Sequence, residues 1–125
     1  MTEPDLDQFD VLVRAAYQKL PAEFRALCGN VVIHTAEKAE PEILAEFGMD
    51  DPLELSGLFE GVELAAADET PPNHVHLYRR SILAELAETP GLTLHDLVTH
   101  VLVHEIGHHF GLSDEDMHAI EDAAE

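Results

Sequence analysis

Apolar side chains recur at helical spacing near the start of the chain. Between residues 6 and 20 they follow one another at steps of three and four, which is typical of one face of an α-helix. The residues in this pattern are Leu6, Phe9, Leu12, Val13, Ala16, Tyr17 and Leu20. Pro21 interrupts the pattern, and residues 21–27 predict a short second helix that Gly29 ends.

The middle of the chain alternates between strand and helix patterns. The β-branched run at residues 31–33 predicts a strand, and residues 41–47 predict a short helix that Gly48 stops. Residues 53–64 predict two short strands around a turn at residues 60–61. The alternation of histidine with apolar residues at 74–78 predicts a further strand, entered from a loop at residues 71–73.

The strongest helix pattern lies in the last third of the chain. Thr93 is a good N-cap, Asp96 stands in the first turn, and Gly111 ends the helix. Its apolar stripe is formed by Leu94, Leu97, Val98, Val101, Leu102 and Ile106. Ser113 with Asp116 then predicts the start of a final helix that runs to about residue 123. Helices at both ends with short strands between them predict an α+β fold, and we expect residues 1–125 to form a single domain.

Charge and cysteine content limit the possible partners. Six lysine and arginine residues stand against 26 aspartate and glutamate residues, a net charge of −20. Such a surface repels phosphates and anionic lipids, so we expect neither nucleic acid nor a membrane as a partner. No apolar run approaches the roughly 18 residues of a membrane span. Cys28 is the only cysteine, and with no basic apolar leader this predicts a protein of the reducing cytoplasm.

The last long helix contains the motif H-E-x-x-H at residues 104–108. Residues four apart lie one helical turn above each other, so the rings of His104 and His108 converge on a point that one Zn²⁺ can occupy. Glu105 is rotated about a quarter turn from His104. It is placed to take a proton from a zinc-activated water molecule, whose pKa the metal lowers to roughly 7.

A third ligand must come from beyond this helix, because two imidazoles leave zinc underligated. Gly111 follows His108 by three residues and tolerates the left-handed conformation that ends a helix, so the chain can turn back there. Asp114, three residues further on, is the predicted third ligand. The alternative for Asp114 is a first-turn residue whose charge the dipole of the last helix favours.

Other histidines are weaker candidates. His109 points about 100° away from His108, and His100 lies about 12 Å of helix rise from His108, so one ion cannot join the whole row. His74 and His76 share one face of a strand and form a possible second metal site, although no third ligand is evident there. Two further histidines carry no comparable signal, His34 and His95.

These residues resemble those of a family of small bacterial zincin-like zinc metallopeptidases, which carry H-E-x-x-H-x-x-G-x-x-D near the carboxyl terminus. The resemblance starts at the helix before residue 31 and includes residues 58–61, 77–80 and 103–112. It implies a compact zincin-like domain with a short mixed sheet packed against helices and the active-site helix near the carboxyl terminus. It also implies zinc held by His104, His108 and Asp114, with Glu105 as general base.

The resemblance brings alternatives for the third ligand. Other zincins supply a glutamate from a second helix, which makes Glu121 the second candidate and His118 a weaker one. The motif is also similar to that of the larger metzincin peptidases. This sequence differs from them because it has no separate methionine turn: Met117 stands only three residues after Asp114.

The resemblance also suggests where a peptide would bind. In zincins an edge strand beside the active-site helix pairs with an extended peptide, and residues 73–79 are the candidate here. Tyr78 or Arg79 would then be candidates to stabilise the oxyanion.

The sequence therefore predicts a zinc-dependent metallopeptidase that hydrolyses peptide bonds of a peptide or protein substrate. The alternative is a non-catalytic zinc-binding module whose acidic surface recruits a basic partner. A catalytic site keeps one metal position open to water, whereas a structural site fills it with a fourth side chain. The candidates for that fourth side chain are His109, Glu115 and His118.

Overall fold

The structure, a computed structural model, describes residues 4–28, 30–60 and 73–124. The helices are α1 (Leu6–Gln18), α2 (Ala22–Cys28), α3 (Pro41–Glu46), the 3₁₀ helix η1 (Pro52–Glu54), α4 (Arg79–Ala87), α5 (Leu94–His109) and α6 (Asp114–Ala123). The strands are β1 (Val31–Ala36), β2 (Gly57–Glu60) and β3 (Asn73–Tyr78). None of the helices in these ranges is long and apolar enough to cross a membrane.

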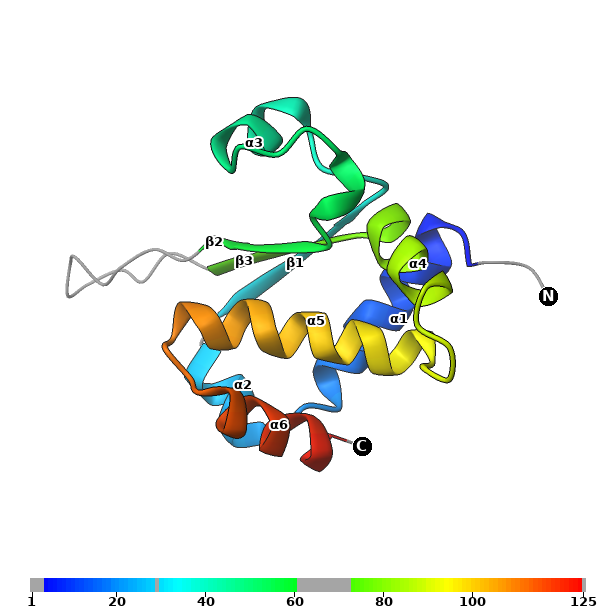
Figure 1. Cartoon of the computed structure of the whole chain (residues 1–125). Helices are drawn as coiled ribbons and strands as arrows, with labels where there is room; N and C mark the ends of the chain where they lie inside the picture. Colours follow the sequence, from blue (N-terminus) through cyan, green and yellow to red (C-terminus); the bar gives the residue numbers. More distant parts are fainter. Residues whose placement is uncertain (1–3, 29, 61–72, 125) are drawn as a thin grey trace.

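The three strands form one mixed sheet in the order β1-β3-β2. Strand β1 runs parallel to β3, and β2 runs antiparallel to it. Helices α1 and α5 lie against one face of the sheet, which we call the inner face, and α3 lies over the opposite, outer face (Figure 1). Helices α2 and α6 lie beyond α5. The predicted α+β fold with a short mixed sheet packed against helices is confirmed.

The main core fills the space between α1, α5 and the inner face of the sheet. Phe9 and Val13 of α1 and Val75 of β3 are completely buried there, together with Leu102 and Ile106 of α5. A smaller cluster covers part of the outer face and consists of Ala39, Leu44, Leu55 and Tyr78. The main core therefore holds α5 against α1 and the inner face of the sheet.

Local signals set the ends of α5 and α6 as predicted. The Thr93 hydroxyl accepts a hydrogen bond from the Asp96 backbone N–H at 3.1 Å. Ser113 and Asp116 form a reciprocal capping box at the start of α6. Gly111 has a φ of +73°, the left-handed conformation that ends α5 and turns the chain towards α6.

Other elements differ from the sequence prediction. Helix α4 is absent from the prediction, and Pro52–Glu54 forms a 3₁₀ turn where the sequence predicts a strand. The first of the two strands predicted within residues 53–64 corresponds to β2, and residues 61–64, where the second is predicted, lie outside the described residues. The prediction that residues 73–79 form an edge strand that pairs with a peptide is wrong, because β3 is the central strand and pairs on both sides.

Helices α5 and α6 approach each other closely at Gly107. A Cβ atom at this position would lie 2.5 Å from Met117 Sδ and 2.9 Å from Met117 Cγ. Met117 is completely buried, so its side chain has little room to move away. The missing side chain of Gly107 therefore sets the distance between the two helices.

Replacing Gly107 with alanine is expected to lower the free energy of unfolding by about 1 kcal/mol. Overpacking against Met117 costs about 1–3 kcal/mol, of which the better helix propensity of alanine returns about 1 kcal/mol. Urea denaturation measures the change. In a Met117→Ala background the same substitution is expected to stabilise the protein, because the obstacle is gone. Stabilisation by Gly107→Ala in the wild-type background would contradict this account.

Candidate metal centre

One surface of α5 places two histidines against α6. The rings of His100 and His104 lie with their centroids 3.9 Å apart, one helical turn from each other. Glu121 reaches them from the last turn of α6, and its side chain is only 18% exposed. Met117 lies one turn before Glu121 on α6, so the packing of Met117 on Gly107 directs Glu121 towards α5.

The two oxygens of Glu121 face different histidines. The Nδ1–H of His100 donates a hydrogen bond to Glu121 Oε1 at 2.7 Å, whereas Nε2 of His104 lies 3.5 Å from Glu121 Oε2. The ligand atoms of these three residues all lie within 4.8 Å of one another. Among the described residues this is the one group of three or more histidine, cysteine or acidic side chains that meets that distance.

The pair formed by His104 Nε2 and Glu121 Oε2 fits a metal ion. Both atoms are shielded from solvent, and neither has a hydrogen-bond partner within the described residues. Buried polar atoms without partners are costly, and an ion between them would satisfy both. Two ligands of one tetrahedral zinc lie about 3.3–3.5 Å apart at the usual bond lengths. The observed 3.5 Å therefore matches the spacing of two zinc ligands.

The protonation states also suit metal chemistry. Burial lowers the pKa of the His104 imidazole, and neighbouring His100 lowers it further, against an opposing effect of the Glu121 carboxylate. A neutral imidazole is the form that binds metal. Burial raises the pKa of the Glu105 carboxyl, which the nearby His108 partly offsets. A glutamate with a raised pKa is a better proton acceptor near neutral pH.

The structure brings His104 and His108 together but not Asp114. The ring centroids of the two histidines are 5.6 Å apart at an angle of 86°, with His108 exposed at the end of α5. Asp114 is exposed on the first turn of α6. In the described part of the chain, no hydrogen bond or ion pair joins it to a histidine of α5. The ligand set of His104, His108 and Asp114 stays a prediction, and the contacts favour Glu121 over Asp114.

Glu105 faces the sheet instead of α6. A Cβ atom on Gly57 of β2 would lie 3.2 Å from Glu105 Cγ and 2.8 Å from Val101 Cγ1. The absence of a side chain at Gly57 thus lets β2 lie directly against α5 at Glu105. Glu105 and the edge strand β2 are therefore neighbours.

The remaining candidates from the sequence have other surroundings. His109 is exposed, and its ring packs on Phe59 with centroids 4.6 Å apart. Tyr78 belongs to the small apolar cluster on the outer face of the sheet. Arg79 donates hydrogen bonds to Glu37 at 2.8 Å and to the Pro4 carbonyl at 2.7 Å. These contacts do not support the oxyanion roles considered for Tyr78 and Arg79.

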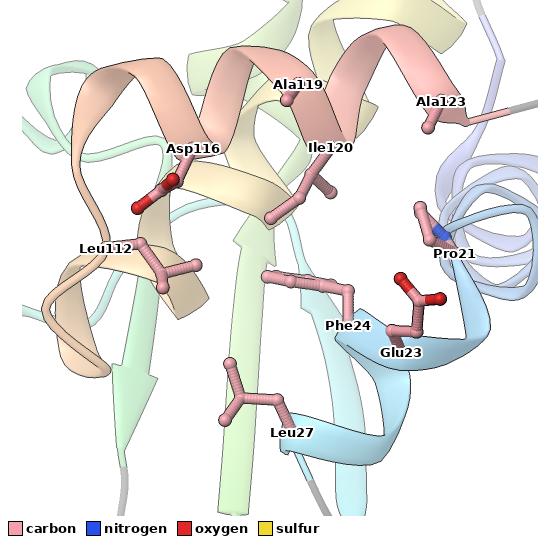
Figure 2. Close-up of a pocket in the computed structure, with 9 residues that line it drawn as sticks. All are labelled: Pro21, Glu23, Phe24, Leu27, Leu112, Asp116, Ala119, Ile120 and Ala123. Atoms are coloured by element: carbon pink, nitrogen blue, oxygen red, sulfur yellow. The ribbon is translucent and has the colours of Figure 1, made fainter.

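A groove of about 500 Å³ lies between α2 and α6, away from these residues. Figure 2 shows Phe24 and Leu27 of α2 facing Leu112 and Ile120 across it. None of the candidate ligands lines the groove. The face of α6 that carries Glu121 is therefore distinct from the face that borders this groove.

Comparisons with known proteins identify a family for this chain. The sequence model of the family described as zincin-like metallopeptidase matches residues 28–124. A solved structure described as a conserved hypothetical protein from Thermo thermophilus aligns with a TM-score of 0.54 at 23% identity. The alignment covers 86% of this chain and 94% of that one, and it shows the fold alone. A search of curated proteins finds no significant match.

Measurements of zinc affinity can distinguish Glu121 from Asp114 as the third ligand. Glu121→Gln is expected to weaken zinc binding more than about tenfold, because the amide removes the negative oxygen that faces His104. Asp114→Asn is the matched control and is expected to change the affinity less than about twofold, since Asp114 is exposed and apart from the histidines. Competition with a chromophoric chelator measures both constants. The opposite ranking of the two variants would return Asp114 to the third position.

Proposed function

The chain belongs to the zincin-like metallopeptidase family, and on this premise we propose that it is a zinc-dependent peptidase. His104, His108 and one carboxylate hold the metal, and Glu105 is the general base. Of the two carboxylates considered, the contacts support Glu121. The observation that carries the proposal is the pair of His104 Nε2 and Glu121 Oε2, which lie 3.5 Å apart, shielded from solvent and without a hydrogen-bond partner in the described residues, with His104 next to Glu105 on α5.

Each of the proposed site residues has a separate role. Zinc, when bound, acidifies water and polarises a peptide carbonyl. The Glu105 carboxylate accepts the proton of the attacking water and passes it to the leaving amine. Burial and the neighbouring His100 lower the pKa of His104, which favours the neutral imidazole that binds metal. Glu121 adds one negative charge and closes the ligand set from α6.

Strand β2 is the proposed docking edge for the peptide. Within the described residues, β2 pairs with β3 on one side only. Its other side can therefore offer backbone N–H and C=O groups to an extended peptide. Because Gly57 lies against Glu105, a peptide paired with β2 would run beside the general base. This role replaces the one that the sequence assigns to residues 73–79.

His100 is the residue that would serve the second candidate function, a non-catalytic zinc module. His100 stands within 4.8 Å of the ligand atoms of His104 and Glu121. If its Nδ1 turned from Glu121 to the metal, it would fill the position that hydrolysis needs open. The hydrogen bond of 2.7 Å to Glu121 occupies that nitrogen, which supports the peptidase instead.

The partners and the location follow from charge and from Cys28. With a net charge of −20 we propose a peptide or protein substrate, and neither nucleic acid nor a membrane. Cys28 is the only cysteine of the sequence, and it is buried with its thiol against the Phe24 carbonyl at 3.1 Å. A single buried thiol is consistent with a reducing compartment, so we propose the cytoplasm.

The test compares Glu105→Gln with the wild type on fluorescently labelled casein and a mixed peptide library. Hydrolysis is expected to fall at least about 100-fold, because the proton acceptor is lost, while the zinc content stays unchanged. Glu85→Gln, an exposed carboxylate on α4, is the control and is expected to keep full activity. Undiminished hydrolysis by Glu105→Gln would overturn the mechanism. A zinc-loaded wild type that cleaves neither probe would favour the non-catalytic module.

A further inference from the structure

Three histidines gather on the outer face of the sheet, opposite α5. His34 comes from β1, and His74 and His76 come from β3. His34 stands directly across from His76 in the strand register, and Glu60 of β2 stands across from His74. Because side chains alternate along a strand, all four project from one face. Three strands thus contribute to one cluster.

The members of this cluster touch one another in pairs. Nε2 of His34 and Nδ1 of His74 are 2.9 Å apart, within hydrogen-bond distance. Nε2 of His76 lies 2.8 Å from Glu60 Oε1. The ring of His34 stacks on both neighbours, with centroids 4.6 Å from His76 and 5.1 Å from His74. His34 is the centre of the cluster.

These ring separations suit a shared metal ion. Imidazoles bound to one tetrahedral zinc have centroids about 5 Å apart, at a zinc to nitrogen distance of about 2.0–2.1 Å. The rings of His74 and His76 therefore each lie at about this spacing from the ring of His34. The ring nitrogens do not yet converge on one point. In the described residues, only the ligand atoms of His100, His104 and Glu121 all lie within 4.8 Å of one another. Rotation about the side-chain bonds is the remaining adjustment.

The electronic state of the rings also suits a cation. A neutral imidazole has one donor nitrogen and one acceptor nitrogen, so each of the three rings can offer one lone pair to a cation. Burial and the two neighbouring histidines lower the pKa of the His34 imidazole. The net charge of −20 raises the concentration of cations near the surface.

We propose that His34, His74, His76 and Glu60 form a second zinc site, separate from the centre on α5. Imidazole is a preferred ligand of zinc, whereas magnesium and calcium prefer oxygen ligands. Glu60 supplies the fourth ligand and the negative charge. With all four positions filled by side chains, the site is structural. A zinc ion there would tie β1, β3 and β2 together across the sheet.

The test counts zinc ions and measures melting temperatures in four proteins after exposure to buffered zinc and desalting. The wild type is expected to retain two ions per chain, and His104→Gln and the double variant His34→Gln/His76→Gln one each. The variant with all three changes is expected to retain none. Zinc is expected to raise the melting temperature of His104→Gln by several degrees and to leave that of the triple variant unchanged.

Glutamine keeps the size and hydrogen bonding of these side chains, so loss of the ion is separable from loss of the fold, which circular dichroism monitors. His95→Gln, a histidine outside both clusters, is the control and is expected to retain two ions. A His104→Gln protein that binds no zinc and gains no thermal stability from it would overturn the second site. That result would leave the proposed peptidase untouched, because His104 belongs to the centre on α5 alone.

Discussion

The close packing of α6 on α5 at Gly107 is the constraint on which the candidate centre depends. With no side chain at Gly107, Met117 can lie directly on α5, and a Cβ atom there would meet its sulfur at 2.5 Å. Glu121 lies one turn beyond Met117 and is thereby brought to 3.5 Å from the His104 ring. A wider separation of the helices would leave the Glu121 carboxylate in solvent, away from the His104 ring. Gly107, the second variable position of the H-E-x-x-H motif, thus determines through packing how close Glu121 lies to His104.

Three faces of helix α5 contact three different parts of the structure. One face, with Leu102 and Ile106, is buried in the core and fixes the helix against α1 and the sheet. A second face presents His100 and His104 to α6, and a third presents Glu105 to the edge strand β2. Since the faces belong to one helix, His104 and Glu105 keep a constant position relative to each other. Preorganisation of this kind is what a hydrolytic site needs.

Local features of the structure could be predicted from the sequence, and features that depend on distant packing could not. The caps at Thr93 and Ser113 and the left-handed Gly111 act within four residues, so the bounds of α5 and α6 follow from their neighbours. The order of the strands is set by tertiary packing, which is why the sequence does not show that β3 is central. For the same reason His34 gives no signal, because its partners stand 40 and 42 positions later in the chain. The sequence analysis places Glu121 second to Asp114 as the third metal ligand, since spacing alone does not show which face of α6 meets α5.

The central claim is that zinc binds between His104 Nε2 and Glu121 Oε2. A crystal structure of the zinc-loaded protein, with anomalous diffraction recorded at the zinc absorption edge, tests it most directly. The account predicts an anomalous peak about 2.0–2.2 Å from each of these two atoms. A zinc peak at α5 that is ligated by Asp114, with the Glu121 carboxylate out of reach, would contradict it.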